Sequence, residues 1–160
     1  MGVAGCGKTT VAKLYAEKTG AVFVEGDEFH PPENIAKMRS GIPLTDGDRA
    51  VWLLALRKII SDSLAKNIFT VLTCSALKMK YREQLQAGDR RIQFVHLAGS
   101  REVIEARLKN RSEHFMPPTL LDSQFAILEP PVDALTFSCE KSPEEIVAEL
   151  IQILRITRTV

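Results

Sequence analysis

The residues best suited to chemistry stand at the start of the chain. Residues 2–9 read Gly-Val-Ala-Gly-Cys-Gly-Lys-Thr and match the phosphate-loop pattern G-x-x-x-x-G-K-[ST] in full. Glycines let a backbone wrap around an anion without Cβ clashes. Lys8 can then contribute charge to the β- and γ-phosphates of a nucleotide, and the Thr9 hydroxyl can ligate Mg²⁺. The alternative is a glycine-rich turn with Lys8 in solvent.

The residues after this run favour the phosphate loop. Apolar residues recur at helical spacing over residues 9–18, and Gly20 follows, so we expect a helix that begins at the loop and ends there. The positive end of such a helix favours anions. The expected nucleotide contacts are Gly2, Val3, Ala4, Gly5, Cys6, Gly7, Lys8, Thr9 and Thr10.

Two acidic residues end the apolar segment 21–27 that follows this helix. Alternation along a strand points Glu25 and Asp27 the same way, toward the phosphate loop. One carboxylate can hold water on Mg²⁺, and the other can orient or deprotonate an acceptor hydroxyl. We therefore predict Glu25 together with Thr9 as metal ligands and Asp27 as catalytic. A polar strand end that caps a turn is the alternative.

Further polar residues follow the other predicted strands. His30 can bind a hydroxylated substrate or cap a helix, and both interpretations stay open. Lys37, Arg39 and Arg49 bring positive charge that suits an anionic acceptor, although a lone cation is often only solvated. The segment from Ser75 to Arg82 adds a hydroxyl and two cations just past a strand end, where ligands bind in parallel sheets.

Arginines near the middle of the chain suggest a lid. Arg107, Arg111 and His114 precede the run Phe-Met-Pro-Pro at residues 115–118. A mobile segment with these charges could close over a nucleotide, exclude water and stabilise charge on a transferred phosphoryl group. An amphipathic helix followed by a turn is the alternative.

The order of elements predicts an α/β fold. Apolar strand-like segments cover residues 21–27, 69–74, 92–97 and 134–139, and helical patterns lie between them at 32–39, 48–66, 78–86, 101–111 and 118–128, with a last helix at 143–156. Strands that alternate with helices favour a parallel sheet covered on both faces. At 160 residues we expect a single domain, 1–160.

Composition excludes several classes of partner. The 21 lysines and arginines balance 20 acidic residues, and no basic stripe with interleaved aromatics is present, so we expect no nucleic-acid partner. No apolar run is long enough to span a membrane. Three scattered cysteines form neither a disulfide framework nor a metal-ligand array, which favours a cytoplasmic protein.

Together these motifs resemble the gluconokinase family, the small ATP-dependent kinases of D-gluconate, over nearly the whole chain. The runs Cys-Ser-Ala-Leu-Lys at 74–78 and Ser-Gln-Phe at 123–125 are more specific than the loop alone. The other matching residues are 2–9, Gly26-Asp27, His30-Pro31, Lys37-Met38, Gly41 with Pro43-Leu44, Asp48-Arg49, Trp52-Leu53, Tyr81-Arg82, 114–118, Leu120-Leu121 and Leu128-Glu129.

The resemblance implies an adenylate-kinase-like P-loop NTPase fold, three α/β/α layers around a parallel sheet, with a small lid at about 107–118. It implies transfer of the ATP γ-phosphate to the 6-hydroxyl of D-gluconate with Mg²⁺, in a protein that is often a homodimer. Lys8, Asp27 and Arg111 would be catalytic, and Arg107 would contact the nucleotide. The implied gluconate contacts are Asp27, His30, Arg49, Lys78, Arg82 and His114. The family usually has Asp at the position of Glu25.

The sequence departs from the family in two further respects. Position 113 is Glu where Gly is common beside the lid histidine, and only Met1 precedes the loop, where a buried first strand is expected. Losing about five buried apolar residues removes roughly 8–15 kcal/mol, comparable to the net stability of a domain. A fragment, an alternative start and a mis-set start codon all remain open. We expect the chain as given to be a weak or inactive kinase.

Two other functions stay open at this point. A related small kinase could phosphorylate shikimate or a nucleoside monophosphate, although His30-Pro31 and the segment 75–82 argue against it. A non-catalytic nucleotide-binding or dimerisation module is the alternative from a different class. It would bind ATP without releasing ADP in response to an acceptor.

Overall fold

Helices and strands alternate along the chain, as the sequence predicts. The computed structural model describes residues 1–109 and 118–154. The strands are β1 (Val22–Glu25), β2 (Thr70–Thr73), β3 (Val95–Ala98) and β4 (Leu135–Ser138). The helices are α1 (Lys8–Thr19), the short 3₁₀ helix η1 (Gly26–Phe29), α2 (Pro32–Arg39), α3 (Asp46–Ala65), α4 (Met79–Gln86), α5 (Arg101–Lys109), α6 (Pro118–Ile127) and α7 (Pro143–Leu154).

Local signals explain where several helices begin and end. Gly20 ends α1 in the left-handed conformation, with φ of 77°, and its N–H donates to the carbonyl of Ala16. Helix α3 begins two residues before the predicted start at Asp48, because the Thr45 hydroxyl accepts from the Asp48 N–H and the Asp48 carboxylate accepts from the Thr45 N–H. This reciprocal capping satisfies two backbone donors that a helix start otherwise leaves free.

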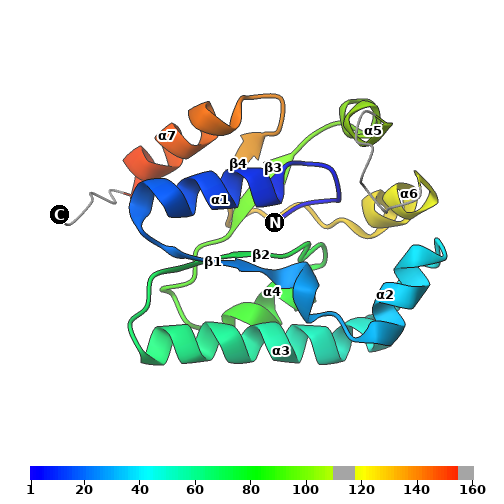
Figure 1. The fold of residues 1–160 in the computed structure, drawn as a ribbon, viewed down its shortest axis with the longest axis horizontal. Helices are drawn as coiled ribbons and strands as arrows, with labels where there is room; N and C mark the ends of the chain where they lie inside the picture. The colour runs from blue at the N-terminus through cyan, green and yellow to red at the C-terminus, as the bar shows by residue number, and fades with distance from the viewer. Residues whose placement is uncertain (110–117, 155–160) are drawn as a thin grey trace.

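The strands are parallel, which confirms the predicted fold class, but in the described residues they form two separate pairs. β1 pairs with β2, so that Val22 lies opposite Thr70 and Glu25 opposite Thr73. β3 pairs with β4, with Val95 opposite Leu135. Helices α1 and α7 pack together on one side of the strands, and α3 and α4 on the other (Figure 1).

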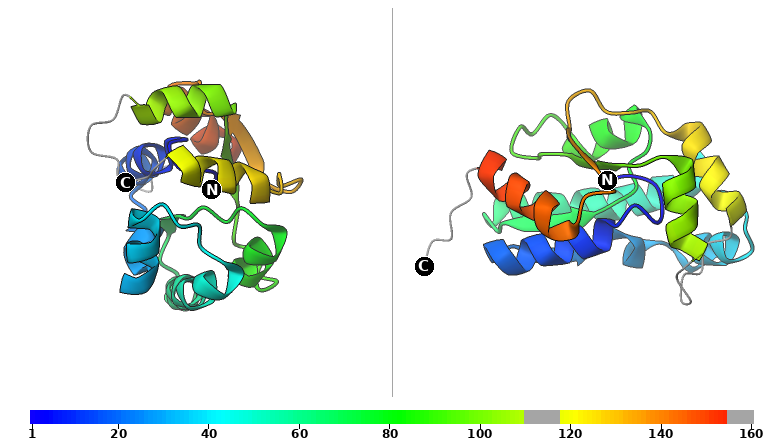
Figure 2. Two further views of the ribbon diagram at one scale, coloured as in Figure 1. Left: turned by 90° about the vertical axis from the view of Figure 1, so that its right-hand side faces the viewer. Right: turned by 90° about the horizontal axis from the view of Figure 1, so that it is seen from above.

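Each helical layer has its own apolar core. Val11 and Tyr15 of α1 pack with Leu97 of β3 and with Val147 and Leu150 of α7. On the other side, the residues of the second core come from α3, α4 and the segment after β2: Trp52, Leu53, Leu56, Cys74, Ala76, Tyr81 and Leu85. The strands thus lie between two cores, as expected for three layers (Figure 2).

Met1 and Gly2 lie between the two strand pairs and together bond to both of them. The amino group of Met1 donates to the carbonyl of Val95, and the carbonyl of Met1 accepts from the N–H of Leu97 at 3.0 Å. The N–H of Gly2 donates to the carbonyl of Ser75 at 3.2 Å, just past β2. Burial lowers the pKa of the Met1 amino group from 8.0 to about 6.

This amino group should make stability depend on pH. Between pH 6 and 8 the unfolded chain binds a proton there that the folded chain does not, so the free energy of unfolding should rise with pH, by at most about 2–3 kcal/mol. Burial also lowers the pKa values of His30 and His96, so below pH 6.5 these two histidines should likewise make the free energy of unfolding rise with pH. Urea unfolding at several pH values measures the rise. Acetylation of the Met1 amine should remove the rise in unfolding free energy above pH 6.5. If that free energy still rises as steeply with pH in the acetylated chain, the Met1 amine is not its cause.

Candidate active site

The loop 2–9 forms a cradle at the start of α1. Gly5 and Gly7 both adopt positive φ, 82° and 95°. A Cβ on Gly5 would lie 2.9 Å from the side chain of Leu108, so the loop can pass under α5 only without a side chain there. Nζ of Lys8 donates to the carbonyls of Gly2 and Val3, both at 3.0 Å. The lysine is thus held inside the curve of its own loop.

A chain of hydroxyls and a carboxylate links the loop to the ends of two strands. The Thr9 hydroxyl donates to one carboxylate oxygen of Glu25 at 2.7 Å. The hydroxyl of Thr73 bonds to the other oxygen, because Glu25 and Thr73 are register partners at the ends of β1 and β2. A hydroxyl beside a carboxylate is the hard-oxygen donor set that Mg²⁺ prefers, so the residues present fit this ion. Thr73 was not among the predicted site residues; its position at a strand end was the available signal.

The loop opens into a cavity of about 470 Å³ at the carboxyl ends of β1 and β2. Predicted nucleotide, metal and acceptor residues share this one space. The lining residues that were predicted from sequence are Ala4, Gly5, Gly7, Lys8, Thr9, Thr10, Glu25, Asp27, His30 and Arg49. Arg39 and Ser75, which the sequence had marked as a cation and a hydroxyl near the site, also line it. The apolar part of the lining includes Ile35, Met38, Leu44 and Trp52.

His30 forms part of the cavity wall and is held on several sides. Its ring stacks on Trp52 with centroids 4.2 Å apart, and its Nδ1 lies 3.3 Å from the amide nitrogen of Asn34. The indole N–H of Trp52 in turn donates to the carbonyl of Gly26 at 2.7 Å. Burial lowers the pKa of His30, while Asp27 acts in the opposite direction. The imidazole is therefore neutral near pH 7 and able to exchange hydrogen bonds with hydroxyls.

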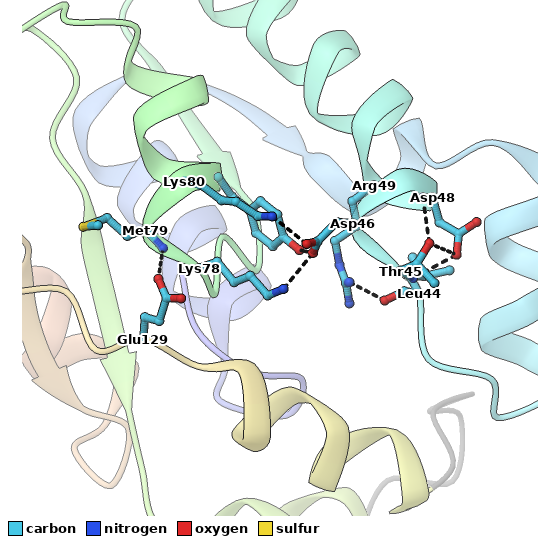
Figure 3. A network of polar contacts seen from close by, with 10 residues as sticks. Leu44, Thr45, Asp46, Asp48, Arg49, Lys78, Met79, Lys80 and Glu129 are labelled. Carbon is cyan, nitrogen blue, oxygen red and sulfur yellow. Dashed lines mark hydrogen bonds and ion pairs between the residues drawn. The ribbon is translucent and has the colours of Figure 1, made fainter.

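Arg49 brings positive charge to the same wall. Arg49 lines the cavity, and its guanidinium donates to the carbonyl of Leu44, a bond drawn in Figure 3. Lys37, in contrast, is paired with Asp48 at 2.6 Å. Of the three cations Lys37, Arg39 and Arg49, the two arginines line the cavity.

Two predicted substrate contacts lie elsewhere in the structure. Lys78 pairs with Asp46 at 2.7 Å, and Lys80 and the Tyr81 hydroxyl converge on the same carboxylate (Figure 3). These bonds hold the pKa of Asp46 well below its usual range. Arg82 is buried and donates to the carbonyls of Ala76 and Leu77, each at 3.1 Å. Neither Lys78 nor Arg82 lines the cavity.

The lid residues can be placed only in part. Arg107 lies on α5 and is half-buried, and it does not line the cavity. Arg111 and His114 lie outside the described residues.

Gln124 of α6 is a further residue of the site that was not proposed as a contact from sequence. Its side-chain oxygen accepts from the N–H of Ala4 at 2.7 Å, and Gln124 lines the cavity. A loop N–H of this kind is a donor for a phosphate oxygen. The signal in the sequence was its place within the Ser-Gln-Phe run at 123–125.

No helix in residues 1–109 and 118–154 is long and apolar enough to cross a membrane. In the same residues no group of three or more His, Cys, Asp or Glu side chains forms a metal site of its own.

The chain is similar to known proteins over most of its length. Residues 1–131 match the family model described as an AAA domain. The chain is 48% identical to a gluconokinase of Gluconobacter oxydans, over 95% of this chain and 87% of that protein. It is 40% identical to the thermoresistant gluconokinase of Escherichia coli, over 97% of this chain and 91% of that protein.

Solved structures agree as well. A sugar kinase from Janibacter superposes with a TM-score of 0.91 at 44% identity, over 98% of this chain and 92% of that one. A gluconokinase from Sinorhizobium meliloti superposes with a TM-score of 0.83 at 41% identity, over 97% and 93%. A Mycobacterium tuberculosis APS kinase, 18% identical with a TM-score of 0.68, shares the fold over 97% and 94%. The chain therefore belongs to the gluconokinase family.

Proposed function

We propose that this protein transfers the γ-phosphate of ATP to the 6-hydroxyl of D-gluconate and so makes 6-phospho-D-gluconate. The observation that carries the proposal is the shared cavity. The phosphate loop with Lys8 lines the same 470 Å³ space as Asp27, His30 and Arg49, so donor and acceptor can meet in it. The names of the relatives support gluconate as the acceptor.

The proposed role of each residue follows from where it lies in the cavity. The loop N–H groups and Lys8 bind and orient the β- and γ-phosphates. Thr9 and Glu25 would hold Mg²⁺, which neutralises phosphate charge when bound. Asp27 accepts the proton of the attacking hydroxyl or orients that hydroxyl. Arg49 offers a planar cation for the gluconate carboxylate, and neutral His30 a hydrogen bond for a gluconate hydroxyl.

Coupled release of ADP tests the proposal. Mg-ATP is supplied with D-gluconate, with shikimate, with a nucleoside monophosphate, or with no acceptor. ADP release that depends on gluconate, with 6-phosphogluconate identified as the product, supports the proposal. Turnover with another acceptor alone, or nucleotide binding without turnover under any condition, would refute it.

Replacement of Arg82 separates a structural role from a role in substrate binding. Arg82→Met leaves two buried carbonyls without their charged donor, so we expect a loss of about 2–3 kcal/mol in the free energy of unfolding. Because Arg82 does not line the cavity, KM for gluconate should change less than twofold. Chemical denaturation and initial rates measure both quantities. A large rise in KM with stability intact would instead support the contact predicted from sequence.

A further inference from the structure

Thr73 is the last residue of β2, and it bonds to the active site without lining its cavity. The residue is only 3% exposed and lies opposite Glu25 in the parallel pair of β1 and β2. Its hydroxyl donates to one carboxylate oxygen of Glu25, and the other oxygen of that carboxylate accepts from Thr9. Glu25 and Thr9 both line the cavity. Any influence of Thr73 on a bound ligand must therefore pass through its neighbours.

A second partner determines the direction of the hydrogen bonds at Thr73. The N–H of Gly26 donates to the Thr73 hydroxyl oxygen at 3.2 Å, in a buried position. A hydroxyl has a single proton, and an ionised carboxylate can only accept, so the proton of Thr73 is directed to Glu25. The same oxygen thus satisfies a backbone donor and orients the carboxylate.

The packing of the strand ends leaves this hydroxyl little freedom to move. A Cβ on Gly26 would lie 2.0 Å from the carbonyl oxygen of Thr73, so the two strand ends approach each other more closely than a side chain would allow. The carbonyl of Gly26 accepts from the indole N–H of Trp52 at 2.7 Å, which holds the other side of this residue. The side chain of threonine is also restricted at χ1, because it is branched at Cβ. Thr73 is therefore a rigid donor toward Glu25.

The carboxylate of Glu25 in turn directs the hydroxyl of Thr9. Thr9 lies exposed in the first turn of α1 and donates to Glu25 at 2.7 Å. Because its proton is bonded to Glu25, the Thr9 oxygen has only lone pairs to offer a third partner, and a divalent cation requires such an oxygen. A glutamate without the bond to Thr73 would have to lose its rotamer freedom when the ion binds.

We propose that Thr73 is a positioning residue for the metal site: its buried hydroxyl holds Glu25, and through Glu25 the hydroxyl of Thr9, in the orientation that binds a divalent cation. This inference rests on the proposed function for the role of Glu25 and Thr9 as metal ligands. It assigns Thr73 no contact with the metal, the nucleotide or the acceptor. Removal of a group that bonds to a metal ligand, and not to the metal, typically lowers metal affinity by about 10- to 100-fold.

Binding of Mn²⁺ to the complex of the protein with ADP tests the proposal without acceptor or turnover. Mn²⁺ favours the same oxygen ligands as Mg²⁺, and electron paramagnetic resonance measures its binding. Thr73→Val keeps the shape of the side chain and removes the hydroxyl. We expect it to raise the dissociation constant for Mn²⁺ by about tenfold or more. The affinity for ADP in EDTA, measured by calorimetry, should change less than twofold. Thr73→Ser keeps the hydroxyl and should restore most of the Mn²⁺ affinity.

Two comparisons show through which partner Thr73 acts. Thr70→Val makes the same change at the other end of β2 and should leave the affinity for Mn²⁺ within twofold of the parent chain. Glu25→Ala removes the carboxylate and should itself weaken Mn²⁺ binding. In that background Thr73→Val should weaken it no further, because the group that Thr73 positions is already absent.

The folded state of each variant is checked by thermal unfolding. Thr73→Val leaves the buried N–H of Gly26 without its acceptor, so its thermal midpoint should fall. Thr73→Ala leaves room for a water at that N–H; it serves as the second variant and should weaken Mn²⁺ binding in the same direction.

The inference would be overturned by a folded Thr73→Val or Thr73→Ala variant that binds Mn²⁺ as tightly as the parent chain. A Glu25→Ala variant with unchanged Mn²⁺ affinity, or one in which Thr73→Val still causes its full loss, would also overturn it. None of these measurements contains gluconate. A failure to phosphorylate gluconate would therefore refute the proposed acceptor and leave the role of Thr73 to be decided by Mn²⁺ binding.

Discussion

Replacing Asp27 with asparagine should lower kcat for gluconate phosphorylation by about 10²- to 10⁴-fold, the range that a positioned general base contributes. Asp27 follows β1 in η1 and lines the cavity that the phosphate loop also lines. Asparagine keeps the size of the side chain and can still accept a hydrogen bond, but it cannot take a proton. Steady-state rates at saturating ATP and gluconate measure the effect.

The neighbouring acid provides a matched control. Glu28 belongs to the same short helix and is exposed, but it does not line the cavity. Glu28→Gln removes the same charge one residue away and should change kcat less than twofold. If both variants lose activity equally, the loss reflects local charge or folding, and Asp27 has no special role.

Replacing Lys8 with methionine should lower kcat/KM for ATP by about 10²- to 10³-fold, because a preorganised charge at the transferred phosphoryl group is lost. The ammonium already points into the curve of the loop, where the carbonyls of Gly2 and Val3 hold it. Methionine keeps the length of the stem, so helix α1 should form as before. Initial rates over a range of ATP concentrations measure kcat/KM for ATP.

A second lysine of the same helix serves as the comparison. Lys18 lies exposed in the last turn of α1, far along the helix from the loop. Lys18→Met should leave kcat/KM for ATP within twofold of the parent chain. Thermal unfolding of both variants checks that Lys8→Met remains folded. A folded Lys8→Met variant with full activity would exclude the proposed contact.

Much of the fold could be predicted from local signals. The start and end of helix α1 were predicted from the phosphate loop and from Gly20. Helix α2 has its predicted bounds, because proline suits the first turn of a helix. The predicted start of α3 at Asp48 is two residues late, because Asp48 forms a capping pair with Thr45 and so lies inside the first turn of the helix. The predicted strand 92–97 is shorter at its start, where β3 begins only at Val95. Its pairing depends on residues far along the chain, which a local pattern does not contain.

Site residues could be predicted where a sequence motif determines the local backbone. They could not be predicted where the tertiary structure determines which residue a side chain contacts. Lys8, Thr9, Glu25 and Asp27 come together because a loop and one strand end place them. Lys78 could not be assigned from sequence, since its partner Asp46 lies 32 residues away at the start of α3. The direction of a long cationic side chain depends on which carboxylate the tertiary structure brings near it.

Trp52 is the single tryptophan of the chain, and it lies in the wall of the active-site cavity with its ring stacked on His30. Tryptophan emission from this protein therefore comes from one known place. It responds to whatever enters beside His30 and to the charge on that imidazole, without any attached dye. Under the proposed function the acceptor binds beside His30, so a titration with gluconate in the absence of nucleotide should change the emission of Trp52.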